Sequence, residues 1–486
     1  MGQDRYHISL QVPASVQPKA RYALRQLSLV LGIRLELVDQ DFACPDAVYG
    51  AAGERGKARC WLPYDPDAYE PRIKHQGHNL EGVKVWGPAS ATESAWDLVG
   101  ATFRQLTFLD ESHVSERSRD NKGIFKVENL PGERQQVLAE LLVENHAAIL
   151  KRRLAAQKRI ADEFVVPLWP QGKKSVFLLS HDTDAITLGS PQELLTNLLK
   201  GLGRRDRTSL TMFEDGLRYI NRPNENPLFG FPGWRKLEET TFRSCFYLFV
   251  KAKDLKRHLN DCRSTVVEQK IDWGILREMA AAGWEFGLHA PIYAKREVSA
   301  LAWGKQFIEE KTGQPVSGLR HHYWALDWRK PHLTFRKHIA AGFQYDASIA
   351  WRDSMGFRAG TCFPFQPFDP DHQAAMPIFE VPTCLMDGHV LEPSTSSSLH
   401  PSLSKTGSSG LALALDLLHQ IKMRNGVAFL NWHTETACNT YRYTGYIDML
   451  AAVLDPVAAD SEVWITTPRE LVTWWSKRQG QLTSRT

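Results

Sequence analysis

The sequence lacks paired cysteines, long apolar stretches and a strong excess of charge of either sign. Its seven cysteines are scattered, their number is odd and none forms a C-x-x-C pair, which argues against a disulfide framework and a thiolate zinc site. No apolar stretch reaches the length that a bilayer requires, and the N-terminal residues do not follow the basic-then-apolar pattern of a secretory signal. Together these absences predict a reduced, cytoplasmic protein without a membrane span.

The charge pattern also excludes one class of partner. A net charge of +4 over 486 residues is too small to indicate binding of nucleic acid. Apolar or acidic residues interrupt the basic runs near Lys151, Lys158 and Arg204, so solvated helix faces explain these runs better than a phosphate track does. Hydrophobic content of 43% and charged content of 23% are ordinary for a globular protein, and the length allows two or three domains.

The chain divides into two compositional blocks. Residues 1–165 show helical apolar spacing from Tyr22 to Leu31 and again from Leu138 to Ile149, but no acids or histidines at ligand spacing. We interpret this block as an accessory domain with a structural or substrate-positioning role. Proline and glycine residues between 167 and 172 mark a boundary, and residues 170–480 form the second predicted domain.

The second block alternates short apolar strands with helical stretches, which predicts a largely parallel sheet. Seven or eight such units indicate a (β/α) barrel, in which reactive side chains collect at the carboxyl ends of the strands. Strands are predicted at Val176–Leu179, Cys245–Phe249, Trp284–Leu288, Ser317–Leu319, Gln344–Tyr345, Phe379–Val381, Val427–Trp432 and Val463–Ile465. The main helices are predicted at Leu276–Ala282, Leu301–Lys311 and Leu411–Met423. The serine-rich segment 393–410 is either a lid over the rim or a disordered insertion.

Two acids follow the first strand of this block. Asp182 and Asp184 are one residue apart, and because side chains alternate along a strand, both are expected to face one cavity. Like charges this close are costly unless a cation or protons neutralise them, so the pair indicates a metal ligand beside a general base. The alternative is an acidic loop that caps the following helix. His289, Arg320 and His433 fall at the ends of other predicted strands and favour the catalytic interpretation.

Five motifs in this order resemble those of the polysaccharide deacetylases, also called carbohydrate esterase family 4 or the NodB type. The motifs are His181-Asp182-Thr183-Asp184, Gly287-Leu288-His289, Arg320-His321-His322-Tyr323, Tyr345-Asp346 and Leu430-Asn431-Trp432-His433. The resemblance covers roughly residues 170–480. It is strongest to a bacterial branch with an N-terminal accessory domain, which the segment from Gly356 to Cys362 also resembles. The resemblance implies a deformed (β/α) barrel of the NodB type, preceded here by an α/β accessory domain.

The resemblance also implies catalytic roles. Asp182 matches the general base and Arg320 the arginine that orients it. Tyr323 stands where a backbone N–H helps to hold the oxyanion, and His433 matches the general acid, which Asp346 would tune. These residue types suit amide hydrolysis, because a carboxylate can accept a proton from water and a histidine can protonate the leaving amine near neutral pH.

One divalent metal ion, commonly zinc, is the cofactor that the resemblance implies, with Asp184 and His289 as ligands. The family usually has a second histidine four residues after the first, and this position is Tyr293 here. Catalytic zinc normally takes three protein ligands. The sequence leaves three candidates for the third ligand, namely His181, His321 and His322.

The predicted function is metal-dependent removal of an acetyl group from an N-acetylated saccharide or glycan precursor. One alternative is an inactive barrel that binds carbohydrate or a partner protein, and another is a related amidohydrolase that cuts a non-sugar C–N bond. The aromatic side chains of Trp324, Trp328 and Trp351 either line a sugar subsite or pack in the core.

Overall fold

The computed structural model describes residues 4–483, apart from eight single residues and three internal stretches. The stretches are 251–260, 262–270 and 392–409, and the single residues are 39, 41, 57, 72, 113, 121, 131 and 159. The serine-rich segment predicted as a lid or an insertion therefore lies outside the described residues, except for Gly410. Among the described residues, no helix combines the length and apolar character needed to cross a bilayer, and six cysteines carry free thiols.

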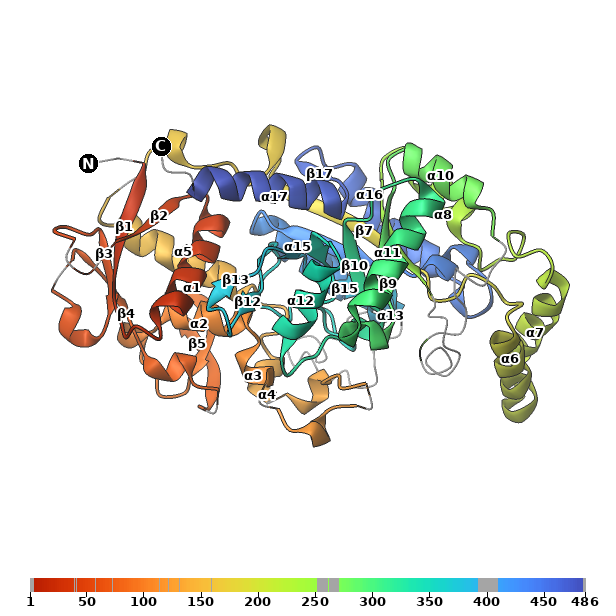
Figure 1. The fold of residues 1–486 in the computed structure, drawn as a ribbon, viewed down its shortest axis with the longest axis horizontal. Helices are drawn as coiled ribbons and strands as arrows, with labels where there is room; N and C mark the ends of the chain where they lie inside the picture. The colour runs from red at the N-terminus through yellow and green to blue at the C-terminus, as the bar shows by residue number, and fades with distance from the viewer. Residues whose placement is uncertain are drawn as a thin grey trace.

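The second half of the chain forms a curled parallel sheet of nine strands (Figure 1). The strand order is β14-β11-β10-β9-β8-β7-β16-β15, with β17 paired to β7, and all pairings are parallel. The edge strands β14 and β15 are joined by residues 381–384, and because four residues span a short distance, the sheet has to curl until its edges approach. This arrangement confirms the predicted deformed (β/α) barrel. The strands are β7 (Ser175–Asp182), β8 (Cys245–Phe249), β9 (Glu285–Ala290), β10 (Gly318–His321), β11 (Tyr345–Asp346), β14 (Phe379–Glu380), β15 (Leu385–Met386), β16 (Val427–Asn431) and β17 (Val463–Ile465).

The structure has a strand at each predicted position, and most residues of these strands are apolar. All residues of β7 to β10 are buried, as a parallel sheet covered by helices requires. β15 was missed, since a two-residue strand carries almost no sequence signal. The predicted helices correspond to α10, α11 and α15. The helices of this half are α6 (Pro191–Arg204), α7 (Arg207–Tyr219), α8 (Phe231–Glu238), α10 (Trp273–Ala281), α11 (Val298–Thr312), α12 (Pro331–Ala340), α13 (Asp387–Leu391), α15 (Gly410–Met423), α16 (Tyr446–Ala458) and α17 (Pro468–Thr483), and a small pair β12 (Phe368–Asp369) and β13 (Ala374–Ala375) lies between them.

The N-terminal block has a parallel sheet of its own, which confirms its α/β class. The order is β2-β1-β3-β4, and an antiparallel pair, β5 with β6, follows. The helix predicted from Leu138 begins later, at Leu142, because the backbone of Leu141 is not helical. The elements are β1 (Arg5–Gln11), α1 (Gln17–Leu31), β2 (Arg34–Val38), β3 (Ala47–Gly50), β4 (Cys60–Pro63), β5 (His75–Leu80), β6 (Val83–Pro88), α2 (Leu98–Leu106), α3 (Leu109–Ser112), α4 (Gly132–Gln135) and α5 (Leu142–Ala155).

Two buried arginines tie the blocks to each other. Arg358 donates from Nε and Nη2 to the carboxylate of Glu111 at 3.0 and 2.5 Å, and both side chains are buried. At the other end of the chain, Arg478 of α17 donates to the carbonyl oxygens of Leu29 and Pro167. Figure 1 shows α17 running along the barrel to α1. The division into domains at residues 165–170 stays a prediction.

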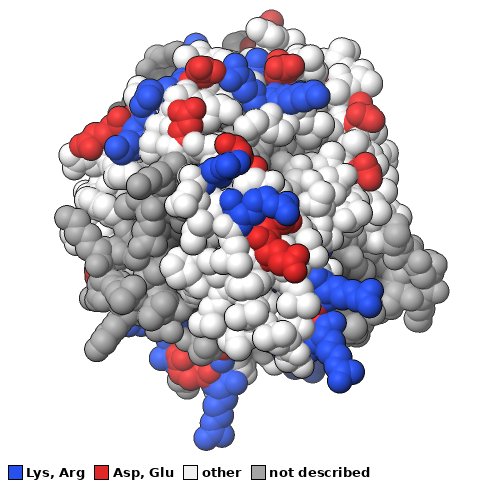
Figure 2. Space-filling model, turned by 90° about the vertical axis from the view of Figure 1, so that its right-hand side faces the viewer, with Lys and Arg blue, Asp and Glu red and all other residues white. Residues whose placement is uncertain are grey.

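The two helices α6 and α7 project from one end of the molecule (Figure 1). Figure 2 looks at this end, where basic and acidic side chains lie next to one another around broad areas without charge. Arg204, Arg205 and Arg207 are exposed here, as predicted for a solvated surface. Leu195, Leu199 and Leu202 of α6 are 58%, 62% and 66% exposed, so α6 carries an apolar stripe in addition to these cations.

A buried histidine in α5 predicts that acid destabilises the fold. Burial lowers the pKa of His146 to about 3, whereas an unfolded chain has a histidine pKa near 6.5. Between these values the unfolded state binds the extra proton, so stability is complete above pH 6.5 and decreases as the pH falls toward 3. We expect His146 to remove roughly 2 kcal/mol from the free energy of unfolding between pH 7 and pH 5.

Urea unfolding at pH 7 and pH 5 measures this contribution. The variant His146→Gln should show a smaller difference between the two pH values than the native protein does. His419→Gln, which changes an exposed histidine of α15, is the matched control and should keep the native difference. An unchanged pH dependence in His146→Gln would contradict the prediction.

Candidate active site and metal centre

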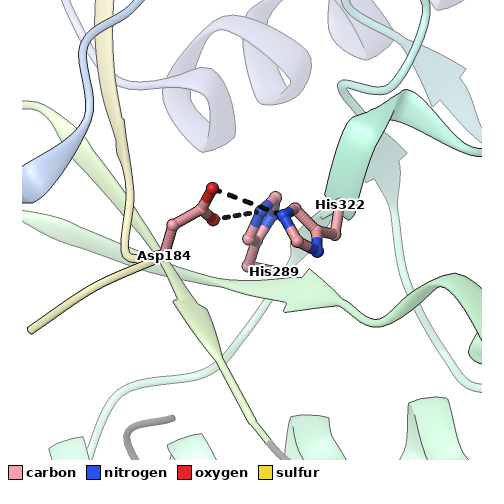
Figure 3. A group of neighbouring side chains, drawn as sticks. All are labelled: Asp184, His289 and His322. Carbon is pink, nitrogen blue, oxygen red and sulfur yellow. Dashed lines mark ion pairs between the residues drawn. The ribbon is translucent and has the colours of Figure 1, made fainter. Parts of the chain in front are cut away.

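Three potential metal ligands meet at the carboxyl end of the barrel sheet. Asp184 follows β7, His289 lies in β9, and His322 begins the short 3₁₀ helix that follows β10. Each offers one ligand atom, and these atoms all lie within 4.8 Å of one another. His289 Nε2 is 3.1 Å from Asp184 Oδ1, and His322 Nε2 is 3.3 Å from Asp184 Oδ2. Figure 3 shows the carboxylate pointing at both rings.

Hydrogen bonds on the far side of each imidazole orient the two rings. His289 Nδ1 lies 3.0 Å from the carbonyl oxygen of Arg320, and His322 Nδ1 lies 2.7 Å from Oδ1 of Asp261. Metal-binding histidines commonly use their second nitrogen in this way, which turns the other nitrogen toward the ion. Two imidazoles with one carboxylate are also a donor set of catalytic zinc sites. The residues present therefore fit a divalent metal ion.

The structure distinguishes the three candidates for a third ligand. Only His322 of these lies in the cluster with Asp184 and His289. His181 is buried, with Nδ1 2.7 Å from the carbonyl oxygen of Trp432 and Nε2 2.7 Å from Oε1 of Glu238. His321 points elsewhere, and its Nε2 is 2.9 Å from Nε2 of His338. His322 is therefore the candidate that the geometry favours for the third ligand, given Tyr293 at the position of the usual second histidine.

Asp182 lies beside the three candidate metal ligands and is held in place by a buried arginine. Arg320 Nη1 donates to Oδ1 of Asp182 at 2.9 Å, and Asn431 Nδ2 donates to Oδ2 at 2.8 Å. His289 Nε2 is 3.9 Å from Oδ2. Burial acts to raise the pKa of Asp182, but the charge of Arg320 outweighs it and holds the pKa below its ordinary value. The carboxylate is therefore ionised at neutral pH and can accept a proton.

His433 approaches the same cluster from the end of β16. Its Nε2 is 3.7 Å from Oδ2 of Asp184, and its Nδ1 is 3.0 Å from both oxygens of Asp387. Burial acts to lower the pKa of His433, but the charge and hydrogen bond of Asp387 outweigh it and hold the pKa well above its ordinary value. His433 is therefore protonated at neutral pH and can donate a proton.

The prediction that Asp346 tunes His433 is wrong, since Asp387 is the carboxylate in contact with this histidine. Asp346 accepts hydrogen bonds from the backbone N–H and the hydroxyl of Ser348 at 2.8 and 3.0 Å, and it lies 3.4 Å from Nδ1 of His338. Its side chain is fully buried. The motif Tyr345-Asp346 thus marks the end of a strand, but the Asp346 side chain is buried against Ser348 and His338 and does not contact His433.

The backbone after His322 is unusual. Tyr323 and Trp324 have φ angles of 57° and 52°, so two successive residues with side chains occupy the left-handed region. Such residues cost of order 1–2 kcal/mol each and concentrate at functional sites. The ring of Tyr323 stacks on His322 with centroids 3.9 Å apart, while Lys122 Nζ lies 4.5 Å from the Tyr323 centroid. The role of the Tyr323 N–H at an oxyanion stays a prediction.

The three tryptophans considered as sugar-binding residues are all buried. Trp324, Trp328 and Trp351 are at most 5% exposed. The guanidinium of Arg358 lies 3.3 Å from the ring centroid of Trp328 and 4.8 Å from that of Trp351. These contacts favour the packing interpretation, because both rings hold the arginine that bonds to Glu111 across the two blocks.

Three acids of the site were missed from the sequence. Asp387 follows the two-residue strand β15, and Asp261 lies between stretches that have no strong pattern. Glu435 lies two residues after His433, and burial raises its pKa to about 8. The only available signal was that Asp387 and Glu435 each follow a short apolar strand of the barrel.

Several solved structures resemble this chain in part. A protein from Mycobacterium smegmatis described as a polysaccharide deacetylase aligns over 65% of this chain and 95% of its own, with 19% identity and a TM-score of 0.40. A protein from Pseudomonas aeruginosa PAO1 with the same description aligns over 66% and 98%, with 14% identity and a TM-score of 0.37. Puue allantoinase aligns over 64% and 92%, with 14% identity and a TM-score of 0.39.

Likenesses at these identities and TM-scores carry no weight in assigning a function. No protein-family model and no curated protein matches the sequence. The functional assignment therefore depends on the geometry of the site and on the five sequence motifs.

Proposed function

We propose that this protein is a metal-dependent hydrolase that removes the acetyl group from an N-acetylated saccharide or glycan precursor. The observation that carries the proposal is the meeting of a three-ligand cluster, an ionised carboxylate and a protonated imidazole at one rim of the barrel. The order of the motifs, which resembles that of the polysaccharide deacetylases, supports the saccharide substrate.

Asp184, His289 and His322 would hold the ion, and zinc is the ion that this donor set suits best. The chemistry that such an ion supplies when bound is polarisation of the amide carbonyl and a lowered pKa of bound water, about 7. The hydrogen bonds of His289 to the Arg320 carbonyl and of His322 to Asp261 keep both rings in place for this role.

The residues of the chain supply the proton transfers. Asp182 accepts the proton of the attacking water, and Arg320 with Asn431 fixes the rotamer in which it does so. His433 donates a proton to the leaving amine, and Asp387 keeps this imidazole charged and oriented. A backbone N–H at Tyr323 would stabilise the negative oxygen of the tetrahedral intermediate.

The alternative of an inactive binding barrel is less well supported than activity. Its main support is Tyr293 at the position of the usual second histidine, but His322 would supply a third ligand from another strand end. Binding alone also does not explain the buried carboxylate of Asp182 and the charged imidazole of His433, because burying each charge costs free energy that a partner has to offset. Hydrolysis of a non-sugar C–N bond would use the same groups, and substrate panels separate it from deacetylation.

Metal analysis tests the proposal directly. We expect the purified protein to hold about one zinc ion per chain. Loss of an outer-shell partner commonly costs 10–100-fold in metal affinity, so loss of a direct ligand in Asp184→Ala or His322→Gln should cost at least about 100-fold. The measurements are zinc content after dialysis and acetate release from a panel of N-acetylated saccharides.

His419→Gln is the control, because it removes an exposed imidazole far from the cluster in the sequence. It should keep native zinc content and native acetate release. Equal and negligible zinc in the native protein and in both ligand variants would contradict metal dependence and would favour the inactive barrel.

A further inference from the structure

A large cavity lies next to the three candidate metal ligands, between the barrel and a loop of the N-terminal block. Its volume is about 900 Å³, within the range of small-molecule sites. Residues between 116 and 123 line it from the N-terminal block, and residues 292–297 and 326–329 line it from the barrel. Asp261 belongs to its wall and contacts the ligand His322 at 2.7 Å, so the cavity lies one hydrogen bond from the cluster.

The acids of this wall already have partners. Asp120 forms an ion pair with Arg352 at 3.0 Å, and Glu116 forms one with Arg329. Asp261 accepts from His322 and from the backbone N–H of Ile292. Asp327 accepts from two backbone N–H groups at the start of α12. Three of the wall acids, Glu116, Asp120 and Asp261, therefore already have a direct partner in an arginine or a histidine, and the wall also contains Glu297.

Three cations of the same wall form no ion pair with a described carboxylate, although the charges of Asp327, Asp120 and Asp261 act on Lys295 from a distance. Among the described residues, Lys122, Lys295 and Arg296 have no carboxylate within ion-pair distance. Lys295 is only 9% exposed, and the hydrogen bond that its ammonium donates runs to the carbonyl oxygen of Lys122 at 3.1 Å. Buried lysines are rare unless they are paired, because desolvation penalises the charged form. The same burial lowers the pKa of Lys295.

Lys122 connects this charge to the candidate active site. Its ammonium lies over the ring of Tyr323, the residue that follows the ligand His322. It belongs to the N-terminal block, so a residue far from the barrel motifs in sequence lies beside the reaction site. An anion between Lys122, Lys295 and Arg296 would give these three cations a direct counter-charge and would lie beside the candidate metal ligands.

We propose that this cavity is a subsite for an anionic group of the saccharide, a carboxylate or a phosphate, held by Lys122, Lys295 and Arg296. The proposal rests on the proposed function and narrows its substrate class to acidic N-acetylated saccharides. It also gives the N-terminal block a role, because Lys122 becomes a specificity-determining residue that the barrel alone does not contain.

Binding of matched charged and neutral saccharides tests the subsite. One pair is a tetrasaccharide of alternating N-acetylglucosamine and glucuronic acid and its methyl ester, which lacks the negative charge. The other pair is N-acetylglucosamine 6-phosphate and N-acetylglucosamine. We expect at least one charged member to bind the native protein about tenfold more tightly than its neutral counterpart, with a preference that decreases as salt rises. The pair that shows the preference distinguishes a carboxylate from a phosphate.

The variant Lys122→Gln should remove most of this preference and leave binding of the neutral members unchanged. Lys126→Gln is the matched control, because Lys126 is exposed, lies in the same loop and pairs with Glu128 outside the cavity. It should keep the native preference. Equal binding of charged and neutral members, no binding of any, or a preference that survives Lys122→Gln would each overturn the proposal.

Acetate release, measured in parallel, separates this proposal from the proposed function. Preferential binding of a charged member without acetate release from any saccharide would support the subsite and contradict deacetylation. Acetate release at equal rates from the charged and neutral members of both pairs would support deacetylation and overturn the anionic subsite.

Discussion

Asp182→Asn is expected to lower acetate release by about 10²–10⁴-fold while zinc content stays native. An amide cannot accept the proton of the attacking water, so the proposed general base is lost. Zinc content should persist because Asp184, His289 and His322, and not Asp182, form the three-ligand cluster. The measurements are kcat on the best N-acetylated substrate and metal content of the same preparation.

Two results separate this role from simple damage to the site. Asp416→Asn, an exposed change in α15, should retain native kcat. Native activity in Asp182→Asn would remove Asp182 from the mechanism. Loss of zinc together with activity would instead mean that Asp182 shapes the metal centre, and the assignment of the base would fail.

Arg320→Met should destabilise the fold by about 3–5 kcal/mol, the usual cost of breaking a buried ion pair by removing one partner. The guanidinium is fully buried, and its hydrogen bonds run to Ser180, Asp182, Ala347 and Thr383 at 2.8–3.1 Å. Methionine fills a similar length but leaves the carboxylate of Asp182 buried without its cation. The free energy of unfolding from urea titration is the quantity to measure.

A double variant makes the cause testable. If the cost arises from the uncompensated charge of Asp182, then Asp182→Asn combined with Arg320→Met should be more stable than Arg320→Met alone. Arg218→Met, at an exposed arginine of α7, should leave the unfolding midpoint nearly unchanged. Additive losses in the double variant would falsify the ion-pair explanation and attribute the cost to packing around Tyr247 and Phe429, which flank the guanidinium.

The barrel and the core of its site could be predicted because both follow from simple repetition. Short apolar strands alternate with helices, and the carboxyl ends of parallel strands share one edge. Asp182, Asp184, His289 and His433 were found by this rule, and the structure brings them together. β8 was predicted with its observed bounds, since all five of its residues are apolar and buried.

Which of several neighbouring polar residues faces the site could not be predicted, because this depends on the residue at which the strand ends. β10 ends at His321, whose side chain turns toward His338, while His322 already belongs to the next turn and faces Asp184. A shift of one residue in that end would exchange the two histidines. Asp346 and Asp387 differ in a similar way, since Asp346 is the last residue of β11 whereas Asp387 follows β15, and only Asp387 contacts His433.

The packing of α17 on α1 has a consequence for synthesis of the protein. Arg478 bonds to the carbonyl oxygen of Leu29, at the end of a helix that the ribosome makes more than four hundred residues earlier. At about 5–20 residues per second, roughly 20–90 s pass between synthesis of α1 and synthesis of α17, the helix that packs on it. During translation the nascent chain therefore exposes a surface that a chaperone can cover, and the two ends become joined only as the last helix emerges.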